Sequence, residues 1–455
     1  MRLFRAIAFA TLTLTTDALS LDLDSIDSTK DAAKSVAKGV LADYPGTQSE
    51  NAIGVWNSPY YFWSAGAVWD ALVDYWHLTG DSSYNDLVAQ ALQAQIGPED
   101  AYMPLNQTAT LMNEDQFYWG RAALTAAERD FVSPSNSIPY VRLASNVFDT
   151  QVLRWDTESC NGGLRRGIFP FNNGYNYKNA GSNAGFFQLA ARLARVTGND
   201  TYSDWASKTF DWLETIGLVG PNGAVYDGTK LQSDCSEINH IEWTVNSGLL
   251  LHGSAIMYNI TNGSPQWRTR VEKLMERSSI FFDDGIMIEA ACEPFGTCNI
   301  DHRFYKGIFA SNLAQTAQYA PFSASTILPL LRSSAQGAAS NACPDADGFC
   351  SYSWTPGTGS NVGGSSDLGH QLSALQVIQA NLVPHASGLA LPGSLPSGPG
   401  SLTSIPGNSS SASGDATSPS QTPGGDTNSA STSRVRDHWV AVAAVLVVAV
   451  LGYFG

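Results

Sequence analysis

Basic residues are scarce in this chain of 455 residues. Lys and Arg number 25 against 41 Asp and Glu, and the formal net charge is -16. A protein that binds nucleic acid needs a basic surface to meet the phosphates, so this balance argues against nucleic acid as a partner. The sequence also lacks a C-x-x-C motif and has no histidines paired at metal-ligand spacing, which argues against a zinc site. It has no G-x-S-x-G either, so a serine hydrolase is disfavoured. We therefore expect neither a metal nor a cofactor.

Residues 1–20 predict a signal peptide. Arg2 and Arg5 precede an apolar run at residues 6–14, which is too short to span a bilayer. A small-x-small cleavage sequence follows at residues 18–20. The alternative is a buried N-terminal helix, but the flanking charge and the cleavage sequence both favour export.

Residues 431–455 predict a signal for GPI attachment. The chain ends in an apolar tail at residues 439–455, after a polar spacer at residues 431–438. A triplet of small residues that begins at Asn428 comes before the spacer, and we take Asn428 as the attachment site. An ordinary tail anchor is the alternative, which the predicted signal peptide argues against. We expect a secreted protein, held by a lipid anchor on the outer face of the plasma membrane and in the cell wall.

Residues 386–430 are dominated by Ser, Thr, Pro and Gly. Such a segment cannot bury enough apolar surface to offset the entropy lost on ordering, so we expect a stalk. Residues 21–385 remain as one folded, catalytic domain.

Six cysteines in an exported chain predict disulfide bonds. Two pairs would enclose short loops, Cys292 with Cys298 and Cys343 with Cys350, and Cys160 and Cys235 would then tie two distant segments together. We favour this pairing, although six cysteines allow fifteen. Sequons for N-glycosylation also fit a secretory route, and they occur at Asn106, Asn199, Asn259, Asn262 and Asn408.

Helical periodicity dominates the folded region, and strand signals are sparse and short. Apolar residues recur at helical spacing in six segments, which are 65–78, 90–96, 119–131, 141–153, 185–196 and 205–216. Two of them end in similar sequences, in which Gly80 and Gly198 are expected as left-handed C-caps. The Ser or Thr that follows each glycine would then cap the next helix.

The aromatic residues that follow these helix ends indicate a repeat. Tyr84 and Tyr202 occupy equivalent positions after the two glycines, and weaker copies place Tyr140 and Trp267 in the series at intervals near 60 residues. Six helical hairpins of this length fill residues 21–385. We therefore predict an all-α fold, an (α/α)6 toroid or barrel of six helical hairpins, with an irregular all-α domain as the alternative.

The adjacent acids Glu114 and Asp115 are the strongest candidates for chemistry. They begin an apolar helix and are followed by amide and aromatic residues. Adjacent like charges repel, so one carboxyl in a pocket would keep its proton. A carboxylic acid beside a carboxylate can break a glycosidic bond, because the acid protonates the leaving oxygen while the carboxylate attacks or stabilises the sugar. The alternative is that the two acids only stabilise the helix dipole.

Two other acidic motifs favour structural interpretations. Asp283 and Asp284 precede Gly285, which is typical of a turn. Asp345 and Asp347 precede Gly348 in a pattern that suggests calcium, but this motif lies inside a short Cys loop and lacks the later Glu of a calcium loop. A turn is favoured there too.

The folded region resembles the fungal members of glycoside hydrolase family 76, the mannan endo-1,6-α-mannosidase family, and in particular the GPI-anchored wall-biogenesis type. The resemblance covers roughly residues 21–383. It rests on several segments, which are 113–116, 161–165, 168–179, 186–199, 226–228, 243–248, 304–307 and 373–377.

The resemblance implies an (α/α)6 barrel and a retaining mechanism with two consecutive acids, usually both Asp. The first would be the nucleophile and the second the general acid/base, which makes them Glu114 and Asp115 here. Glu at the first position departs from the usual pattern and moves that carboxylate outward by one methylene. Family position also implies that Asp227 binds sugar hydroxyls, and weaker candidates for binding or stacking are Asn172, Tyr175, Tyr118 and Trp243.

Three functions remain open from the sequence. The first is an endo-acting, retaining α-1,6-mannosidase or transglycosidase of the fungal wall, with α-1,6-mannan or the GPI-core glycan as donor and β-glucan as a possible acceptor. The second is a non-catalytic protein that binds wall mannan on the same fold, a possibility that the altered acid pair keeps open. The third is a six-hairpin glycosidase with a different sugar.

Overall fold

The computed structural model describes residues 18–46, 53–344, 346–356, 367–387 and 390–396. All of them belong to one unit, Met1–Ile405. Most of the predicted signal peptide and stalk, the predicted GPI signal, Asn408, Asn428 and Asp345 lie outside the described residues.

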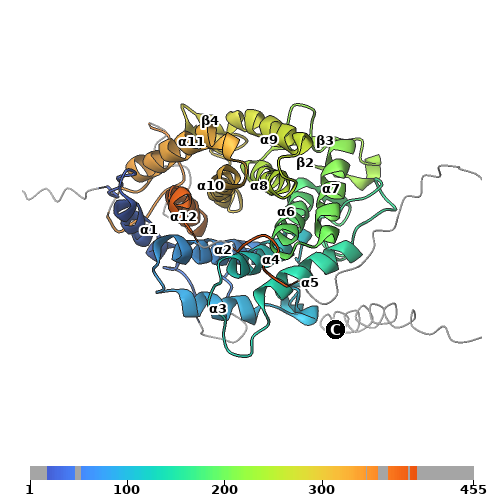
Figure 1. Cartoon of the computed structure of the whole chain (residues 1–455), viewed down its shortest axis with the longest axis horizontal. Coiled ribbons are helices and arrows are strands. Elements are labelled where there is room, and N and C mark those ends of the chain that lie inside the picture. The colour runs from blue at the N-terminus through green and yellow to red at the C-terminus, as the bar shows by residue number, and fades with distance from the viewer. Residues whose placement is uncertain (1–17, 47–52, 345, 357–366, 388–389, 397–455) are drawn as a thin grey trace, which may run out of the picture. The chain divides into compact units, whose positions relative to one another are not determined.

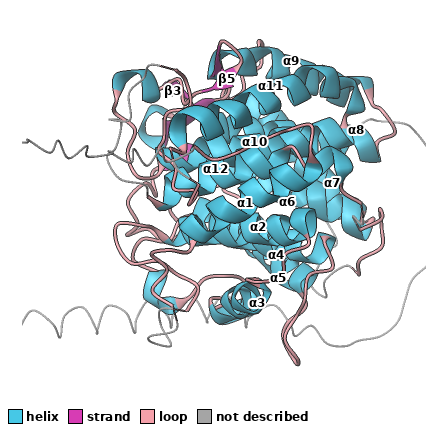
Figure 2. Cartoon of the chain, turned by 90° about the vertical axis from the view of Figure 1, so that its left-hand side faces the viewer, coloured by secondary structure: helices cyan, strands magenta, loops and turns pink. Residues whose placement is uncertain are grey.

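Helices make up most of the molecule, and its few strands are short (Figure 2). The described residues form twelve α-helices, which are α1 (Ile26–Val40), α2 (Phe62–Thr79), α3 (Asn85–Ala94), α4 (Asn113–Glu128), α5 (Tyr140–Leu153), α6 (Ala180–Thr197), α7 (Asp200–Thr215), α8 (Thr244–Ile260), α9 (Pro265–Arg277), α10 (His302–Tyr319), α11 (Ala324–Gly337) and α12 (Leu368–Ala380). The six helices predicted from periodicity are α2 to α7. None of the described helices combines the length and hydropathy needed to cross a bilayer.

The helices form two concentric rings (Figure 1). The even-numbered helices α2 to α12 form the inner ring, where each packs on the next and α12 packs back on α2. The odd-numbered helices lie outside them. Burial follows this arrangement, because all 13 residues of α12 are buried, whereas α9 buries one stripe of side chains. The predicted (α/α)6 barrel is confirmed.

The predicted helix ends are confirmed in part. Gly80 and Gly198 adopt left-handed conformations as the C-caps of α2 and α6. The predicted Ser or Thr N-caps are wrong. Tyr84 precedes α3 without a side-chain cap, and the side chain of Asn199 caps α7 by accepting a hydrogen bond from the backbone N–H of Thr201.

The repeated aromatic position marks the beginning of four successive outer helices. These residues lie at the N-cap or in the first turn of α3, α5, α7 and α9, and they are Tyr84, Tyr140, Tyr202 and Trp267. The last three are buried. The repeat in the sequence is therefore a packing position, where an aromatic side chain lies at the beginning of four of the outer helices.

The predicted disulfide pairing is confirmed, with bonds Cys160–Cys235, Cys292–Cys298 and Cys343–Cys350. The first joins the loop before α6 to the loop before α8, two connections at the same end of the inner ring. Among the predicted sequons, Asn106, Asn259 and Asn262 are exposed and Asn199 is half-buried.

Two small sheets lie in these connections. Strands β1 (Tyr177–Asn179), β2 (Tyr226–Lys230) and β3 (Ile238–Glu242) pair antiparallel in that order. Strands β4 (Phe282–Asp283) and β5 (Ile286–Met287) form a hairpin whose turn residues, Asp284 and Gly285, both have positive φ. The turn predicted at this second acid pair is therefore confirmed.

The boundary predicted after His385 needs correction, because the next described residues pack on the barrel. The N–H groups of Ala390, Gly393 and Leu395 donate to the carbonyls of Glu128, Arg195 and Val196, at 3.0, 2.9 and 2.8 Å. These carbonyls lie at the C-terminal ends of α4 and α6. Composition predicted a stalk here, but the backbone hydrogen bonds hold this segment, which we call the C-terminal strap (residues 390–396), against the domain.

Candidate active site

A cleft of about 450 Å³ lies where the inner helices begin. Five inner helices contribute a residue of their first turn or two to its lining, and these are Trp63, Glu114, Gly181, Asn246 and Tyr305. The N-terminus of a helix carries a partial positive charge from its unpaired N–H groups. Several such ends directed at one cleft favour negative charge within it, and carboxylates indeed gather there.

Glu114 and Asp115 both line this cleft, from the first turn of α4. Asp115 is 5% exposed, and its Oδ2 accepts a hydrogen bond of 2.7 Å from the backbone N–H of Met112. This bond closes the beginning of the helix and fixes the side chain. The structure therefore brings the predicted acid pair to one cavity, rather than to a sealed core.

The Glu114 carboxylate is held on both oxygens. The Arg166 guanidinium lies 2.9 Å from Oε1, and the side-chain amide of Asn179 donates to Oε2. Asn179 is itself fixed, because it ends β1 and its Oδ1 caps α6. Gly181 lies beside the same carboxylate, where a Cβ would stand 2.7 Å from Oε2. The longer Glu side chain therefore occupies space that only glycine leaves free.

The pKa of Asp115 is raised to about 8, mainly by burial and next by the neighbouring negative charge of Glu114. At neutral pH this carboxyl keeps its proton. The pKa of Arg166 is raised as well, mainly by the charge of Glu114. The guanidinium therefore stays protonated beside the Glu114 carboxylate. The structure thus places a carboxyl group with a raised pKa beside a carboxylate that is hydrogen-bonded on both oxygens.

Two other carboxylates line the cleft, and each is bound by a tryptophan. Asp227 accepts from Trp243 Nε1 at 3.0 Å and also from Tyr177 Oη and Asn239 Nδ2, at 2.7 and 3.1 Å. Asp301 accepts from Trp63 Nε1 at 3.1 Å. The indole N–H groups thereby fix two acceptors at the cleft.

Aromatic side chains supply much of the remaining wall. Tyr61 and Trp63 lie at the N-cap and in the first turn of α2, and Tyr118 lies in the second turn of α4. The rings of Trp63 and Tyr118 are 5.0 Å apart. From α8 and α10 come Trp243 and His302, stacked at 4.2 Å. Burial lowers the pKa of His302 to about 4, so this ring is neutral. Flat apolar surfaces beside hydrogen-bonding carboxylates are suited to binding a sugar.

Two predicted binding residues need correction, because neither lines the cleft. The Asn172 amide donates to the carbonyls of Thr108 and Ala109, and its Oδ1 accepts from the N–H of Phe169. Its polar atoms are used in fastening the loop. Tyr175 lies under Arg165, whose guanidinium is 4.6 Å from the ring centre, in a separate hollow. The other predicted binding residues do line the cleft, and these are Tyr118, Trp243 and Asp227.

Three further residues of the cleft have no signal of their own in the sequence, and these are Arg166, Asn179 and Asp301. Asn179 and Arg166 lie in or beside segments that carried the family resemblance, so their neighbourhood was recognised but not their contacts. Asp301 stands at the beginning of an apolar helix, where an acid has an ordinary explanation as a cap. Only the closure of the ring brings these residues to α4.

One group of potential metal ligands occurs among the described residues, formed by Cys292, Cys298 and His302. The two cysteines are joined in a disulfide, so they offer no thiolate. This group is therefore no basis for a metal centre.

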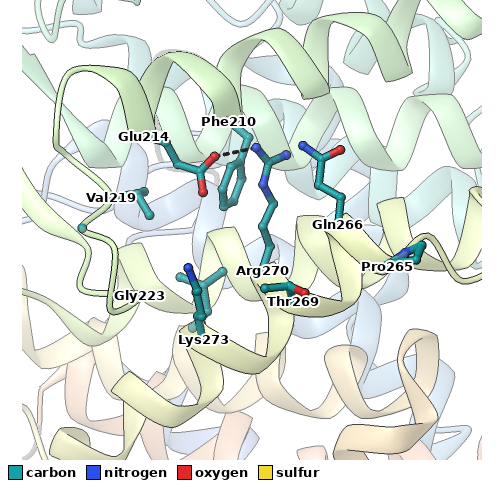
Figure 3. A pocket seen from close by; sticks show the side chains of 11 residues that line it. Phe210, Glu214, Val219, Gly223, Pro265, Gln266, Thr269, Arg270 and Lys273 are labelled. Atoms are coloured by element: carbon teal, nitrogen blue, oxygen red, sulfur yellow. Dashed lines mark hydrogen bonds and ion pairs between the residues drawn. The ribbon is translucent and has the colours of Figure 1, made fainter.

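A second hollow, of about 360 Å³, lies on the outer wall between α7 and α9 (Figure 3). Its main charged group is Arg270, which pairs with Glu214 and Asp211 and lies over the Phe210 ring at 4.2 Å. The guanidinium is thus already partnered. This hollow has no acid pair, and none of its lining residues belongs to an inner helix, so the cleft remains the candidate site.

The comparisons with known proteins agree with this geometry. The model of Glycosyl hydrolase family 76 matches residues 28–391. Mannan endo-1,6-alpha-mannosidase DCW1 of Saccharomyces cerevisiae is 44% identical over 368 residues, which are 80% of this chain and 81% of the relative. The crystal structure of Dfg5 from Chaetomium thermophilum in complex with glucosamine is 38% identical, with a TM-score of 0.77, and the match covers 81% of this chain and 94% of that one.

A more distant structure shares the fold. An inactive variant of the alpha-1,6-mannanase GH76A of Salegentibacter sp. HEL1_6, in complex with alpha-1,6-mannotriose, is 19% identical with a TM-score of 0.63. The match covers 78% of this chain and 99% of that one.

Proposed function

Because the chain belongs to glycosyl hydrolase family 76, we propose that its cleft cuts α-1,6-linked mannose chains internally and with retention of configuration. The observation that carries this proposal is the adjacent pair, Asp115 protonated and Glu114 held as a carboxylate, in an open cleft with aromatic walls. The choice of α-1,6-mannan rests on the relatives, whose names give that activity.

The first step uses both members of the pair. Asp115 gives its proton to the glycosidic oxygen as the bond to the sugar breaks, and Glu114 attacks the anomeric carbon to form a glycosyl ester. Arg166 and Asn179 aim the Glu114 carboxylate and restrain it before the attack. The leaving chain departs with the proton of Asp115.

The second step reverses the roles. Asp115, now ionised, takes a proton from an incoming hydroxyl group, which attacks the anomeric carbon and releases Glu114. If the hydroxyl belongs to water the result is hydrolysis, and if it belongs to a sugar the result is transfer. We propose that the donor is wall mannan or the glycan core of a GPI anchor, and that a β-glucan is the acceptor. The predicted signal peptide and GPI anchor would put the enzyme on the outer face of the membrane and in the wall, where both glycans lie.

Asp115→Asn tests the proposal. This variant keeps the shape of the side chain but has no proton to donate, so release of products from an α-1,6-mannan oligosaccharide should fall at least about 1,000-fold. Asp283→Asn removes an exposed acid from the β4–β5 hairpin and serves as the matched control, which should keep wild-type activity. Wild-type turnover by Asp115→Asn would sink the catalytic assignment and favour the non-catalytic, mannan-binding alternative.

Adding a glucan oligomer to the same assay separates transfer from hydrolysis. A transferase should yield a longer product that contains both sugars, detected by mass spectrometry. If every cleavage yields free reducing sugar, whatever the acceptor concentration, the transfer part of the proposal is wrong while the glycosidase part stands.

A further inference from the structure

The two-step mechanism gives no task to two carboxylates of the cleft, Asp227 and Asp301, and Asp301 has the fewer hydrogen-bond donors. Its Oδ1 accepts from Trp63 Nε1 at 3.1 Å, and within the described part of the chain no donor reaches Oδ2. Two other carboxylates of the cleft accept more hydrogen bonds. Asp227 has three donors, and Glu114 has both Arg166 and Asn179.

The side chain of Asp301 does not perform the ordinary function of an acid at its position. Asp301 is the N-cap residue of α10, where an aspartate normally accepts a hydrogen bond from the first-turn N–H groups. Here it makes no such cap, and instead it lines the cleft. The backbone is held by Asn299, whose Oδ1 accepts from the N–H groups of Asp301 and His302 at 3.0 and 3.1 Å. The carboxylate is thus fixed towards the cleft at the expense of a cap.

The surroundings of this carboxylate suit a ligand that carries hydrogen-bond donors. Burial raises the pKa of Asp301, and the charge of Glu114 raises it as well, whereas the hydrogen bond from the Trp63 indole lowers it. Asp301 is half-buried, and no ion pair among the described residues includes it. A partly desolvated carboxylate with a free acceptor oxygen is stabilised when further donors reach it. Sugar hydroxyls are such donors, and they project from the edge of a ring that the aromatic walls would hold.

We propose that Asp301 is a sugar-binding residue, whose free oxygen accepts hydrogen bonds from hydroxyl groups of the donor sugar held over the acid pair. This inference rests on the proposed function and assigns one of the groups that would position the sugar ring. Trp63 is the positioning residue behind it, because its indole fixes the other oxygen of the carboxylate.

Binding measured without turnover tests this inference. The probe is α-1,6-mannotriose, titrated calorimetrically into Asp115→Asn, which holds the sugar without cutting it. Adding Asp301→Ala should weaken binding at least about tenfold, since a hydrogen bond to a charged group is lost. Adding the isosteric Asp301→Asn should weaken binding less, because the amide oxygen still accepts. Adding Asp283→Asn should change nothing.

A series of monodeoxy trisaccharides sharpens the test. If Asp301 binds a particular hydroxyl, the penalty of Asp301→Ala should disappear for the trisaccharide that lacks this group, an outcome that a merely structural role would not give. Equal affinity of Asp115→Asn with and without Asp301→Ala would overturn this inference alone. No binding by Asp115→Asn itself would overturn the mannan assignment together with it. An Asp301→Asn enzyme that binds normally but does not turn over would also contradict us, because it would put Asp301 in the chemistry.

Discussion

Glu114 is one methylene longer than the aspartate that the family resemblance predicts at its position, and the structure shows how the cleft accommodates it. The carboxylate reaches Arg166 and Asn179, and Gly181 leaves room at Oε2. The sequence could reveal the substitution but not its compensation, because Gly181 belongs to a different helix. The altered pair is therefore compatible with an intact site.

Gly181→Ala should disturb Glu114 specifically. The new Cβ would stand 2.7 Å from Oε2, so the carboxylate must move, and a displacement of this order costs roughly 100-fold in rate. Adding Glu114→Asp, which shortens the side chain, should restore part of the loss. Steady-state rates of the single and double variants check this, with melting temperatures as the control for folding. A double variant with no more activity than Gly181→Ala would contradict the steric explanation.

The raised pKa of Asp115 predicts a dependence of activity on pH. The acid must carry its proton in the first step, so kcat/KM should fall as the pH rises through about 8. A rate measured from pH 5 to 9 should show this alkaline limb. An unchanged rate at pH 9 would mean that another group protonates the leaving oxygen.

The same pKa predicts a dependence of stability on pH. The folded-state pKa lies above that of an unfolded aspartate, so the folded protein holds a proton that the unfolded chain has lost, and stability falls as the pH rises from about 4 to about 8. For one proton the slope is at most about 1.4 kcal/mol per pH unit. Asp115→Asn has no such proton. As the pH rises, the melting temperature of the wild type should therefore fall relative to that of this variant. A constant difference between the two would refute the assigned pKa.

At the scale of elements, the sequence predicts the helices well because each inner or outer helix carries its own periodicity and its own end signals. Gly80 and Gly198 need no tertiary context to end a helix. The loops are harder, since an asparagine can bind a ligand or fasten its own backbone, and the sequence is the same in both cases. Asn172 was predicted at the cleft for this reason, although its amide holds the loop instead.

Asn172→Ala should therefore act through the loop. Three hydrogen bonds from one buried side chain would be lost, which costs about 1–3 kcal/mol of stability. The loop carries Arg166 at one end and Asn179 at the other, so activity should fall, but less than in Asp115→Asn. Hydrogen exchange should show faster exchange confined to residues 167–177. If hydrogen exchange in this segment stays at the wild-type rate and only the affinity for sugar falls, Asn172 would have to contact the sugar directly.

At the scale of the molecule, the ring determines what the sequence can and cannot predict about the site. The acid pair is predictable because its two members are adjacent on one helix. The ring brings the beginnings of α6 and α10 close to that of α4. This arrangement places Arg166, Asn179 and Asp301 at the cleft. No local pattern records such distances, and the family resemblance supplies the fold on which they meet.

The C-terminal strap lies at the other end of the ring, and this position predicts opposite effects on stability and activity. It pairs with the last turns of α4 and α6, near the buried ion pair of Glu128 with Arg192. The cleft, in contrast, lies where the inner helices begin. A chain that ends at His385 loses three backbone hydrogen bonds and the packing of Ala390 and Leu395 on the core, about 2–4 kcal/mol in total.

Its melting temperature should thus fall by several degrees relative to a chain that ends at Pro396, while both cut mannan equally well at 25 °C. The chain that ends at Pro396 is the matched control, because it lacks all the later residues but keeps the strap. Equal melting temperatures would show that the domain already ends at His385, as composition predicted. Lower activity of the shorter chain at 25 °C would instead mean that the strap influences the cleft across the whole length of the inner helices.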